Sequence, residues 1–171
     1  MGNRPIAFVA GTHKFRDKSS PYYRERFDAD VEFLLDEWMH LGVPIVIGDA
    51  DGVDIEVQRY LSSRGYDDVV VYYSGDHPRN LISHNWFCQY VDASTCEPGS
   101  VEWHAQKDLK MCQVATEGLF IICDEGSKAT RRNLHRLLDA AKPVEILELS
   151  KYGTKYDRWI DPGDVPEEVN L

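Results

Sequence analysis

The sequence lacks the features of a membrane protein. None of its apolar runs approaches the roughly 18 consecutive residues that a membrane-spanning helix needs. No basic segment followed by an apolar run and small residues, as in a secretory leader, opens the chain. We therefore expect a cytoplasmic protein without a membrane partner.

An excess of basic residues is also missing. The chain has 19 Lys and Arg residues against 29 Asp and Glu, so its net charge is -10. Proteins that bind nucleic acids without sequence preference need a basic surface that releases counterions from the phosphates. The charge therefore argues against a nucleic-acid partner, although a local basic patch is compatible with it.

Metal and cofactor motifs are scarce. The four cysteines form no CxxC pair, and in a cytoplasmic chain we expect them to be reduced. His84, Cys88, Cys96 and His104 could be combined into a metal site, but their intervals are irregular, whereas zinc ligands usually come as tight pairs. Neither GxGxxG nor GxxxxGK[ST] occurs. We expect no metal and no resident cofactor.

Short apolar runs alternate with helical patterns along most of the chain. Buried strands are predicted at residues 5–10, 44–48, 69–73, 118–123 and 144–147. Helical spacing follows from about residues 28, 53, 101 and 130. This alternation predicts an α/β domain with a mostly parallel sheet and helices on both faces. The domain is expected over 1–149, with 150–171 as a tail that packs on the surface or is partly mobile.

The least regular segment is 74–100, where we predict loops. Its aromatic residues Trp86, Phe87 and Tyr90 are expected to be buried. In the helix predicted after it, Ala105, Leu109 and Cys112 are expected to face inward.

Three loops rich in Gly, Ser, Thr and Asp follow predicted strands, at residues 11–13, 48–54 and 124–130. Right-handed crossovers bring the carboxyl ends of parallel strands to one edge of the sheet. Ligands of such sheets bind in the crevice outside that edge, so the three loops are the expected binding region.

The helix start in the last of these loops carries unusual charge. Lys128, Arg131 and Arg132 fall in the first turn, where the backbone dipole is already positive and each cation costs up to about 1 kcal/mol. One interpretation is a phosphate site formed by these cations, Ser127, Thr130 and the exposed helix N–H groups. The other is that the cations point into solvent.

The turn from Asp49 to Asp54 carries three carboxylates, with Asp51 between them. They could hold ribose hydroxyls, or act as nucleophile or acid in N-glycosidic cleavage. They could instead cap the following helix, and we expect at least one to do so. By default, Arg79 in its loop and the pair 107–108 on its helix are expected to be solvated.

Several segments carry a resemblance to a known family. They are Val9–His13, Gly48–Asp54, Val71–Tyr73 with Pro78–Asn80 and Trp86, Lys107–Met111, and Gly118–Asn133. In this order they resemble the SLOG superfamily, Rossmann-like domains related to cytokinin-activating phosphoribohydrolases and to the DNA-processing protein Smf/DprA. The closer likeness is to a branch of small SLOG proteins. The resemblance implies a Rossmann-like three-layer sandwich that binds a nucleotide-type ligand, such as a nucleoside monophosphate, NAD or an ADP-ribose derivative, with its phosphate near the helix start.

The helix-start loop departs from the phosphoribohydrolase pattern Gly-Gly-x-Gly-Thr-x-Glu-Glu. Arg132 and Asn133 stand at the two Glu positions, one of which is catalytic in that family. The small SLOG turn Asp-Gly-x-Ser-x-Gly-Thr fits better, but Glu125 and Ala129 stand at two of its Gly positions. The missing Glu pair favours a binding module over an enzyme.

The predicted function is therefore that of a sensor or binding module for a nucleotide-derived small molecule. One alternative is a nucleotide N-glycosidic hydrolase or transferase that uses a carboxylate of the acidic turn. Another is DprA-like handling of single-stranded DNA. A homodimer is expected, with Trp38, Trp86 or Trp103 at its interface. The expected ligand-binding residues are Gly11, Thr12, Gly48, Asp49, Ala50, Gly52, Asp54, Arg79, Lys107, Asp108, Asp124, Ser127, Lys128 and Thr130.

Overall fold

A seven-stranded sheet forms the centre of the computed structural model, which describes residues 4–13, 25, 27–123, 127–150, 153–162 and 164. The strands are β1 (Ala7–Gly11), β2 (Ile45–Gly48), β3 (Val69–Tyr73), β4 (Phe87–Tyr90), β5 (Glu117–Cys123), β6 (Val144–Ser150) and β7 (Gly153–Ile160). Their order is β4-β3-β2-β1-β5-β6-β7, and only β7 is antiparallel to its neighbour.

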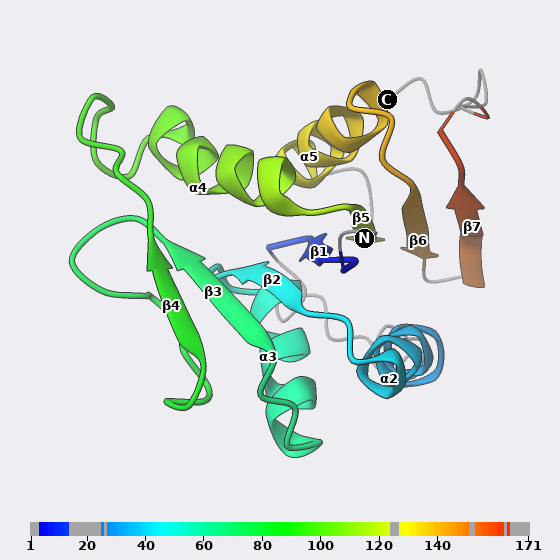
Figure 1. The fold of residues 1–171 in the computed structure, drawn as a ribbon. Helices are drawn as coiled ribbons and strands as arrows, with labels where there is room; N and C mark the ends of the chain where they lie inside the picture. Colours follow the sequence, from blue (N-terminus) through cyan, green and yellow to red (C-terminus); the bar gives the residue numbers. More distant parts are fainter. Residues whose placement is uncertain are drawn as a thin grey trace.

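Helices cover both faces of this sheet (Figure 1). They are α2 (Glu32–Leu41), which follows a π-helical turn η1 (Phe27–Val31), then α3 (Val53–Ser63), α4 (Val101–Val114) and α5 (Lys128–Asp139). The helices α2 and α3 lie on one face, and α4 and α5 on the other. The architecture is an α/β Rossmann-like three-layer sandwich, which confirms the predicted fold class.

The central strands are apolar on both faces because each face is covered. Along β5, Leu119 and Ile121 pack into the core beneath α2 and α3, whereas Phe120 and Ile122 pack beneath α4 and α5. Phe8 of β1 lies edge-on to Phe120, with ring centroids 5.7 Å apart. A strand that is buried on both sides has a continuous apolar run in its sequence, so these central strands could be predicted from the sequence.

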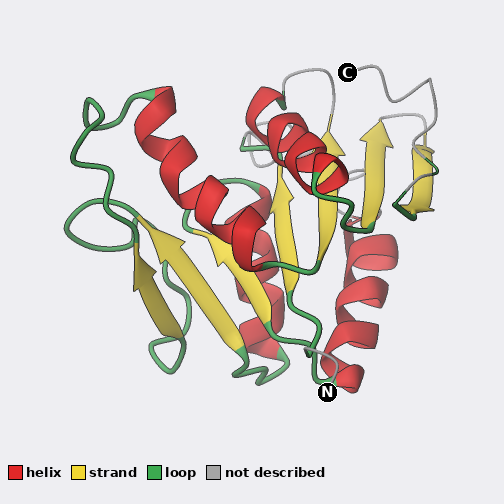
Figure 2. Cartoon of the chain, turned by 45° about the horizontal axis from the view of Figure 1, so that its top comes forward, coloured by secondary structure: helices red, strands yellow, loops and turns green. Residues whose placement is uncertain are grey.

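The order of the strands creates a switch point between β1 and β5. From β1 the chain proceeds outward through β2, β3 and β4, and α4 then returns it to the other side of β1 (Figure 2). The connections that leave the carboxyl ends of β1 and β5 therefore diverge in opposite directions. Crevices of this kind bind ligands in open parallel sheets.

Both edge strands were missed by the sequence analysis. The strand β4 lies in the segment predicted as loops, and Phe87 (65 % exposed) and Tyr90 (49 % exposed) are not buried as expected, while Trp86 is. The strand β7 lies in the predicted tail, with Trp159 exposed and Ile160 buried. An edge strand needs no second apolar partner, so its sequence lacks the signal of a central strand.

The inward face of α4 also differs from the prediction. Leu109 is exposed, whereas Lys107, predicted to be solvated, is only 4 % exposed. Cys112 is buried as expected. Among the described residues, none of the helices combines the length and the apolar character that crossing a bilayer requires.

Candidate functional site

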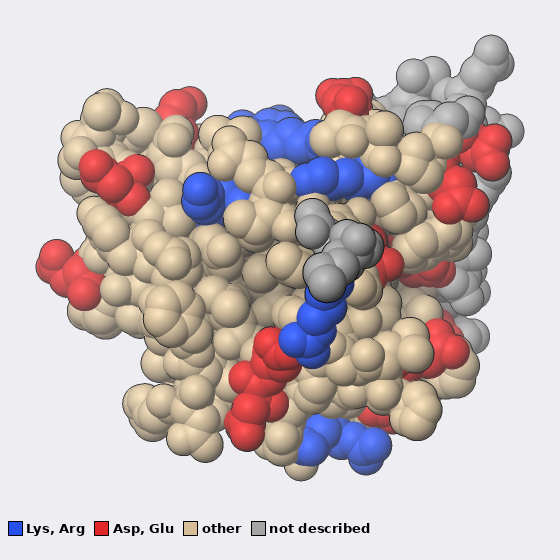
Figure 3. All heavy atoms as spheres, viewed as in Figure 1, with Lys and Arg blue, Asp and Glu red and all other residues tan. Residues whose placement is uncertain are grey.

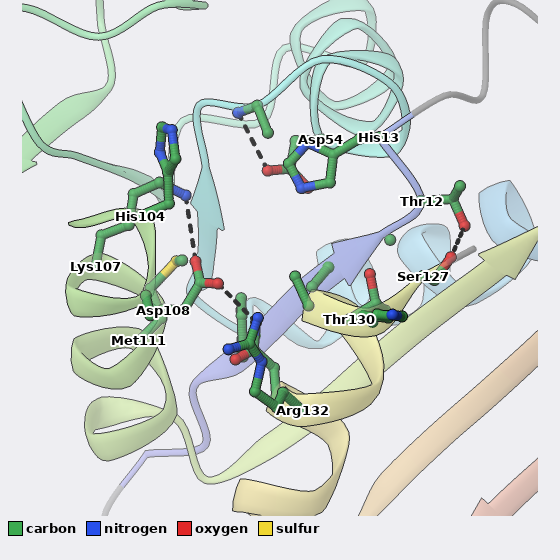
Figure 4. A pocket seen from close by; sticks show the side chains of 18 of the residues that line it. Thr12, His13, Asp54, His104, Lys107, Asp108, Met111, Ser127, Thr130 and Arg132 are labelled. Carbon is green, nitrogen blue, oxygen red and sulfur yellow. Dashed lines mark hydrogen bonds and ion pairs between the residues drawn. The ribbon is translucent and has the colours of Figure 1, made fainter. Parts of the chain in front are cut away.

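A cleft of about 540 Å³ lies between α4 and α5, over the carboxyl ends of β1 and β5. Its walls come from the loop after β1, the start of α3, the inner face of α4 and the first three turns of α5 (Figure 4). On the face drawn in Figure 3, Lys and Arg side chains gather near α4 and α5, and Asp and Glu are spread over the rest of the surface. The cleft itself is lined by Arg79, Lys107, Lys128, Arg132 and Arg136, against the carboxylates of Asp54 and Asp108. The cleft is therefore a locally basic region of an acidic protein.

Thr12 joins the elements that form the floor. Its Oγ1 accepts a hydrogen bond from the Cys123 backbone N–H at 2.8 Å and shares a second hydrogen bond with the Ser127 hydroxyl. Both hydroxyl-bearing residues are buried. One side chain thus ties the end of β1 to the end of β5 and to the residue that precedes α5.

The first turn of α5 faces the cleft. Ser127, Lys128 and Thr130 all line it, and the first N–H groups of any α-helix have no acceptor within the helix. Thr130 is 3 % exposed, and among the described residues its hydroxyl has no hydrogen-bond partner. Arg131, one position further, instead pairs with Glu148 at 3.8 Å.

Asp49 lies beneath the cleft and does not line it. Its carboxylate is 1 % exposed and accepts hydrogen bonds from Arg79: from the backbone N–H at 3.0 Å, from Nε at 3.2 Å and from Nη2 at 2.8 Å. Burial raises the pKa of Asp49, but the Arg79 hydrogen bonds and the Lys107 charge outweigh it and leave that pKa below its ordinary value. Asp49 is therefore an ionised partner that fixes Arg79.

Asp51, the second candidate of the acidic turn, is exposed and accepts a hydrogen bond from the Asn80 amide at 3.1 Å. None of the three aspartates caps α3, so that prediction is wrong: the N-cap is Gly52, with no side-chain hydrogen bond. Gly52 has φ +81°, and a Cβ there would lie 2.2 Å from the Thr12 carbonyl oxygen. The loops approach too closely for a side chain at the cap.

Asp54 is the member of the acidic turn that lines the cleft. It is 7 % exposed, and its Oδ2 accepts a hydrogen bond from the Ala50 backbone N–H at 3.3 Å. Burial raises the pKa of Asp54 to about 7, with the charge of Lys107 opposing the increase. At neutral pH this carboxyl can therefore donate a proton as well as accept one.

Lys107, in the middle of α4, lies close to Asp54. Its Nζ is 3.2 Å from Asp108 Oδ1 and 3.7 Å from Asp49 Oδ1. Gly48 makes room for this arrangement, since a Cβ there would lie 2.6 Å from Asp54 Oδ2 and 3.0 Å from Lys107 Nζ. The predicted solvated ion pair is thus a buried one, formed because the end of β2 has no side chain at this point.

Two histidines also line the cleft: His13, from the predicted loop 11–13, and His104, which was not predicted to belong to the site. Burial lowers the pKa of both imidazoles, and the charges of Lys107 and Arg79 lower it further. The His104 ring lies edge-on to Trp103, and its Nδ1 is buried without a hydrogen-bond partner among the described residues. Both rings are neutral at pH 7, available as hydrogen-bond donors or acceptors.

Most of the predicted binding residues meet in the cleft, while Gly48, Asp49 and Gly52 support it from below and Asp124 lies outside the described residues. The predicted residues that line it are Gly11, Thr12, Ala50, Asp54, Arg79, Lys107, Asp108, Ser127, Lys128 and Thr130. Arg132 was predicted as a cation of the helix start and His13 as part of the loop 11–13, and both line the cleft. The lining residues that were not predicted include His104, Met111, Asn133 and Arg136. Helical spacing could have found two of them: Arg136 follows Arg132 by four residues, and His104 precedes Lys107 by three.

No grouping of three or more His, Cys, Asp or Glu side chains in the described part of the chain could hold a metal ion. No family model matches the sequence, and neither does a curated protein or a solved structure. A function for this protein must therefore be inferred from its fold and from the geometry of the cleft.

Proposed function

We propose that this protein binds a phosphorylated, nucleotide-type small molecule in the cleft between α4 and α5. The observation that carries the proposal is the start of α5, where the Thr130 hydroxyl, which forms no hydrogen bond with a described residue, faces the same cleft as the first helix N–H groups and the cationic side chains. The volume of about 540 Å³ is ordinary for a small-molecule site. Its position at the switch point is where open parallel sheets bind nucleotides.

A phosphate at the start of α5 would satisfy groups that the protein leaves unsatisfied. The Thr130 side chain lines the cleft, and its hydroxyl forms no hydrogen bond with a described residue, so it can donate one to a phosphate oxygen. Its position three residues after Ser127 places it in the first turn, beside the N–H groups that favour an anion. Lys128 adds a charge at the same end of the helix.

The opposite wall suits a ribose and a base. Val101, Ala105 and Met111 of α4 give it an apolar surface, and Val101 is 57 % exposed. The neutral His104 ring adds a polar edge beside them. The likeness of the segments around the cleft to SLOG domains supports the same class of ligand. Because this protein lacks the Glu pair of the phosphoribohydrolases, we favour a function in which the ligand is bound but not turned over, as in a sensor.

Asp54 supports a second candidate function, cleavage of the N-glycosidic bond. A protonated Asp54 would donate its proton to the leaving base nitrogen as the bond between C1′ and that nitrogen breaks. Water would then form the new bond to C1′ and return its proton to Asp54. The chemistry needs a carboxyl that is protonated near neutral pH, and the raised pKa of Asp54 meets that condition.

The test measures binding and turnover separately. Calorimetry with AMP, NAD and ADP-ribose should show binding that adenosine, which has no phosphate, does not reproduce. Chromatography of the same mixtures detects any released base. Base release that is abolished in Asp54→Asn would establish the second candidate. Adenosine binding as tightly as AMP, or no nucleotide binding at all, would contradict the proposed phosphate site.

We also propose a homodimer through the β4 edge of the sheet. Phe87 and Tyr90 are exposed there, whereas Trp86, one of the expected interface residues, is buried with its Nε1 donating to the Tyr66 carbonyl. Light scattering should give twice the mass of one chain, and Phe87→Asp should give a monomer. A wild-type monomer at high concentration would contradict this.

A further inference from the structure

Three cationic side chains follow one another along the wall that α5 contributes to the cleft. Lys128, Arg132 and Arg136 are spaced four residues apart and all line the cleft. At 1.5 Å per residue the row spans roughly 12 Å of helix. Like charges four residues apart on a helix repel one another, so such a row destabilises α5 unless a counterion lies along it.

The row has no such counterion within the described part of the protein. Neither Lys128, Arg132 nor Arg136 forms an ion pair with a described residue. Arg131 shows the contrast: it belongs to the same helix, lies outside the cleft, and pairs with Glu148 at 3.8 Å. The unpaired positions are thus those that face the cleft.

The other cations of the cleft are already neutralised. Arg79 is held by Asp49 at 2.8 Å, and Lys107 by Asp108 at 3.2 Å. The second oxygen of Asp108 accepts a hydrogen bond from the Asn133 amide at 3.1 Å. The net positive charge of the cleft therefore resides on α5.

Arg136, at the far end of the row, is oriented by a neutral group. Its Nη1 donates to Asn133 Oδ1 at 2.7 Å, and Asn133 is 3 % exposed. A buried amide that fixes a guanidinium without neutralising it leaves the remaining N–H groups free for an anion. Roughly 12 Å of helix separate the backbone of Arg136 from that of Lys128, so Arg136 faces a different part of the cleft from a phosphate at the start of α5.

We infer that the cleft has a second anionic subsite, formed by Arg132 and Arg136, and that its ligand is a nucleotide with a pyrophosphate group. This inference rests on the proposed function for the first phosphate, at Lys128 and Thr130. It narrows the proposed ligands to nucleoside diphosphates and pyrophosphate-linked nucleotides, and it excludes nucleoside monophosphates as the preferred ligand.

Calorimetric titrations with AMP, ADP, ADP-ribose and inorganic pyrophosphate test this. ADP and ADP-ribose should bind the wild-type protein about tenfold or more tightly than AMP, as expected for charge-assisted hydrogen bonds. Arg136→Gln should remove that preference, because it should weaken the binding of ADP and ADP-ribose much more than that of AMP. Lys128→Gln should weaken AMP and ADP together. Arg131→Gln is the matched control, because it removes a charge of α5 outside the cleft and should change none of these affinities.

The outcomes separate this inference from the proposed function. Equal affinities for AMP and ADP, or an Arg136→Gln variant that weakens both equally, would overturn the second subsite and leave the first phosphate site standing. No binding of any of the four probes would overturn both. A single-stranded oligonucleotide that displaces ADP and binds more tightly would show that the row contacts nucleic acid and overturn the small-ligand assignment. Circular dichroism of each variant establishes that it is folded.

Discussion

Arg79 holds the buried carboxylate of Asp49 through three donors, its backbone N–H, Nε and Nη2. The contact fastens the loop after β3 to the end of β2, across 30 residues of sequence. Leu81, Ile82 and Trp86 pack the later part of that loop against the core, and the ionic contact of Arg79 fixes its earlier part beside the cleft.

Replacing Arg79 with Met should destabilise the protein. Asp49 would remain buried with only Lys107 at 3.7 Å as a counter-charge. We expect the free energy of unfolding to fall by about 2–3 kcal/mol. This is less than the usual cost of breaking a buried ion pair, because Arg79 is 41 % exposed. Urea unfolding measures the change.

The same substitution should have a smaller effect at low pH. The folded-state pKa of Asp49 is lowered, so the stability that its ionised form contributes is present above pH 4 and is lost as the pH falls further. The difference in unfolding free energy between variant and wild type should therefore shrink below pH 4.

The control for that experiment is Arg64→Met. Arg64 pairs with Asp36 at 3.5 Å, and both side chains are exposed. Such pairs contribute about 1 kcal/mol or less. Equal losses from the two substitutions would mean that the Arg79 contact is no stronger than a surface pair.

Asp54→Asn should increase stability at alkaline pH. The folded-state pKa of about 7 lies above the ordinary value of 3.8, so between these values the folded protein retains a proton that the unfolded chain releases. Wild-type stability should therefore fall as the pH rises from 4 to 7 and stay low above it. The Asn variant lacks this dependence, and at pH 8 we expect it to be more stable by on the order of 2 kcal/mol.

Chemical unfolding at pH 5 and pH 8 measures this difference. Two parallel pH profiles would show that the pKa of Asp54 is not raised, and would remove the basis for its role as an acid. If Asp54→Asn is stabilised at pH 8 but binds nucleotides normally, the Asp54 carboxyl is needed neither for folding nor for binding, which supports a role in catalysis.

Gly48→Ala should disturb Asp54 and Lys107 together. The new Cβ would lie 2.6 Å from Asp54 Oδ2 and 3.0 Å from Lys107 Nζ, and overpacking of this kind costs about 1–3 kcal/mol. In an Asp54→Ala background the closer of the two contacts is gone, so the same substitution should cost less. Additive losses in the double variant would show that Gly48 does not act through Asp54.

Thr130→Val and Thr116→Val should have opposite effects. The Thr130 hydroxyl has no partner among the described residues, so its loss should leave stability unchanged but weaken AMP binding about tenfold. Thr116 Oγ1 accepts from the Ile6 N–H at 2.8 Å and donates to the Ile6 carbonyl at 3.2 Å. Its loss should destabilise by about 1–3 kcal/mol and leave binding unchanged. Thermal unfolding and calorimetry on both variants are decisive. A destabilised Thr130→Val with normal AMP affinity would contradict the phosphate site.

The sequence predicted the layers of the fold because strands buried on both faces and helices buried on one leave clear apolar patterns. Apolar patterning could not reveal β4 and β7, since an edge strand with one neighbour needs fewer apolar residues. The edge of the sheet that carries the cleft followed from the crossover rule, and the structure brings Thr12, Asp54 and Thr130 to it.

The ionic core of the cleft could not be predicted in the same way. Lys107, Asp49 and Asp54 are close only because β2 and α4 lie together in space, and a lysine in a helical pattern reads as solvated. The pKa of Asp54 depends on that burial. By contrast, the row on α5 was visible in the sequence at intervals of four, and only its orientation toward the cleft needed the structure.

The surroundings of Lys107 also limit the chemistry that this cleft can perform. Burial lowers the pKa of its ammonium group, but Asp108, Asp54 and Asp49 outweigh burial and raise that pKa above its ordinary value. An amine acts as a nucleophile toward a carbonyl only when it is deprotonated. A nearly inaccessible lysine beside a cleft is the arrangement usually associated with imine-forming enzymes. Lys107 nevertheless remains protonated as a fixed positive charge. Borohydride should therefore not trap aldehydes or ketones on Lys107.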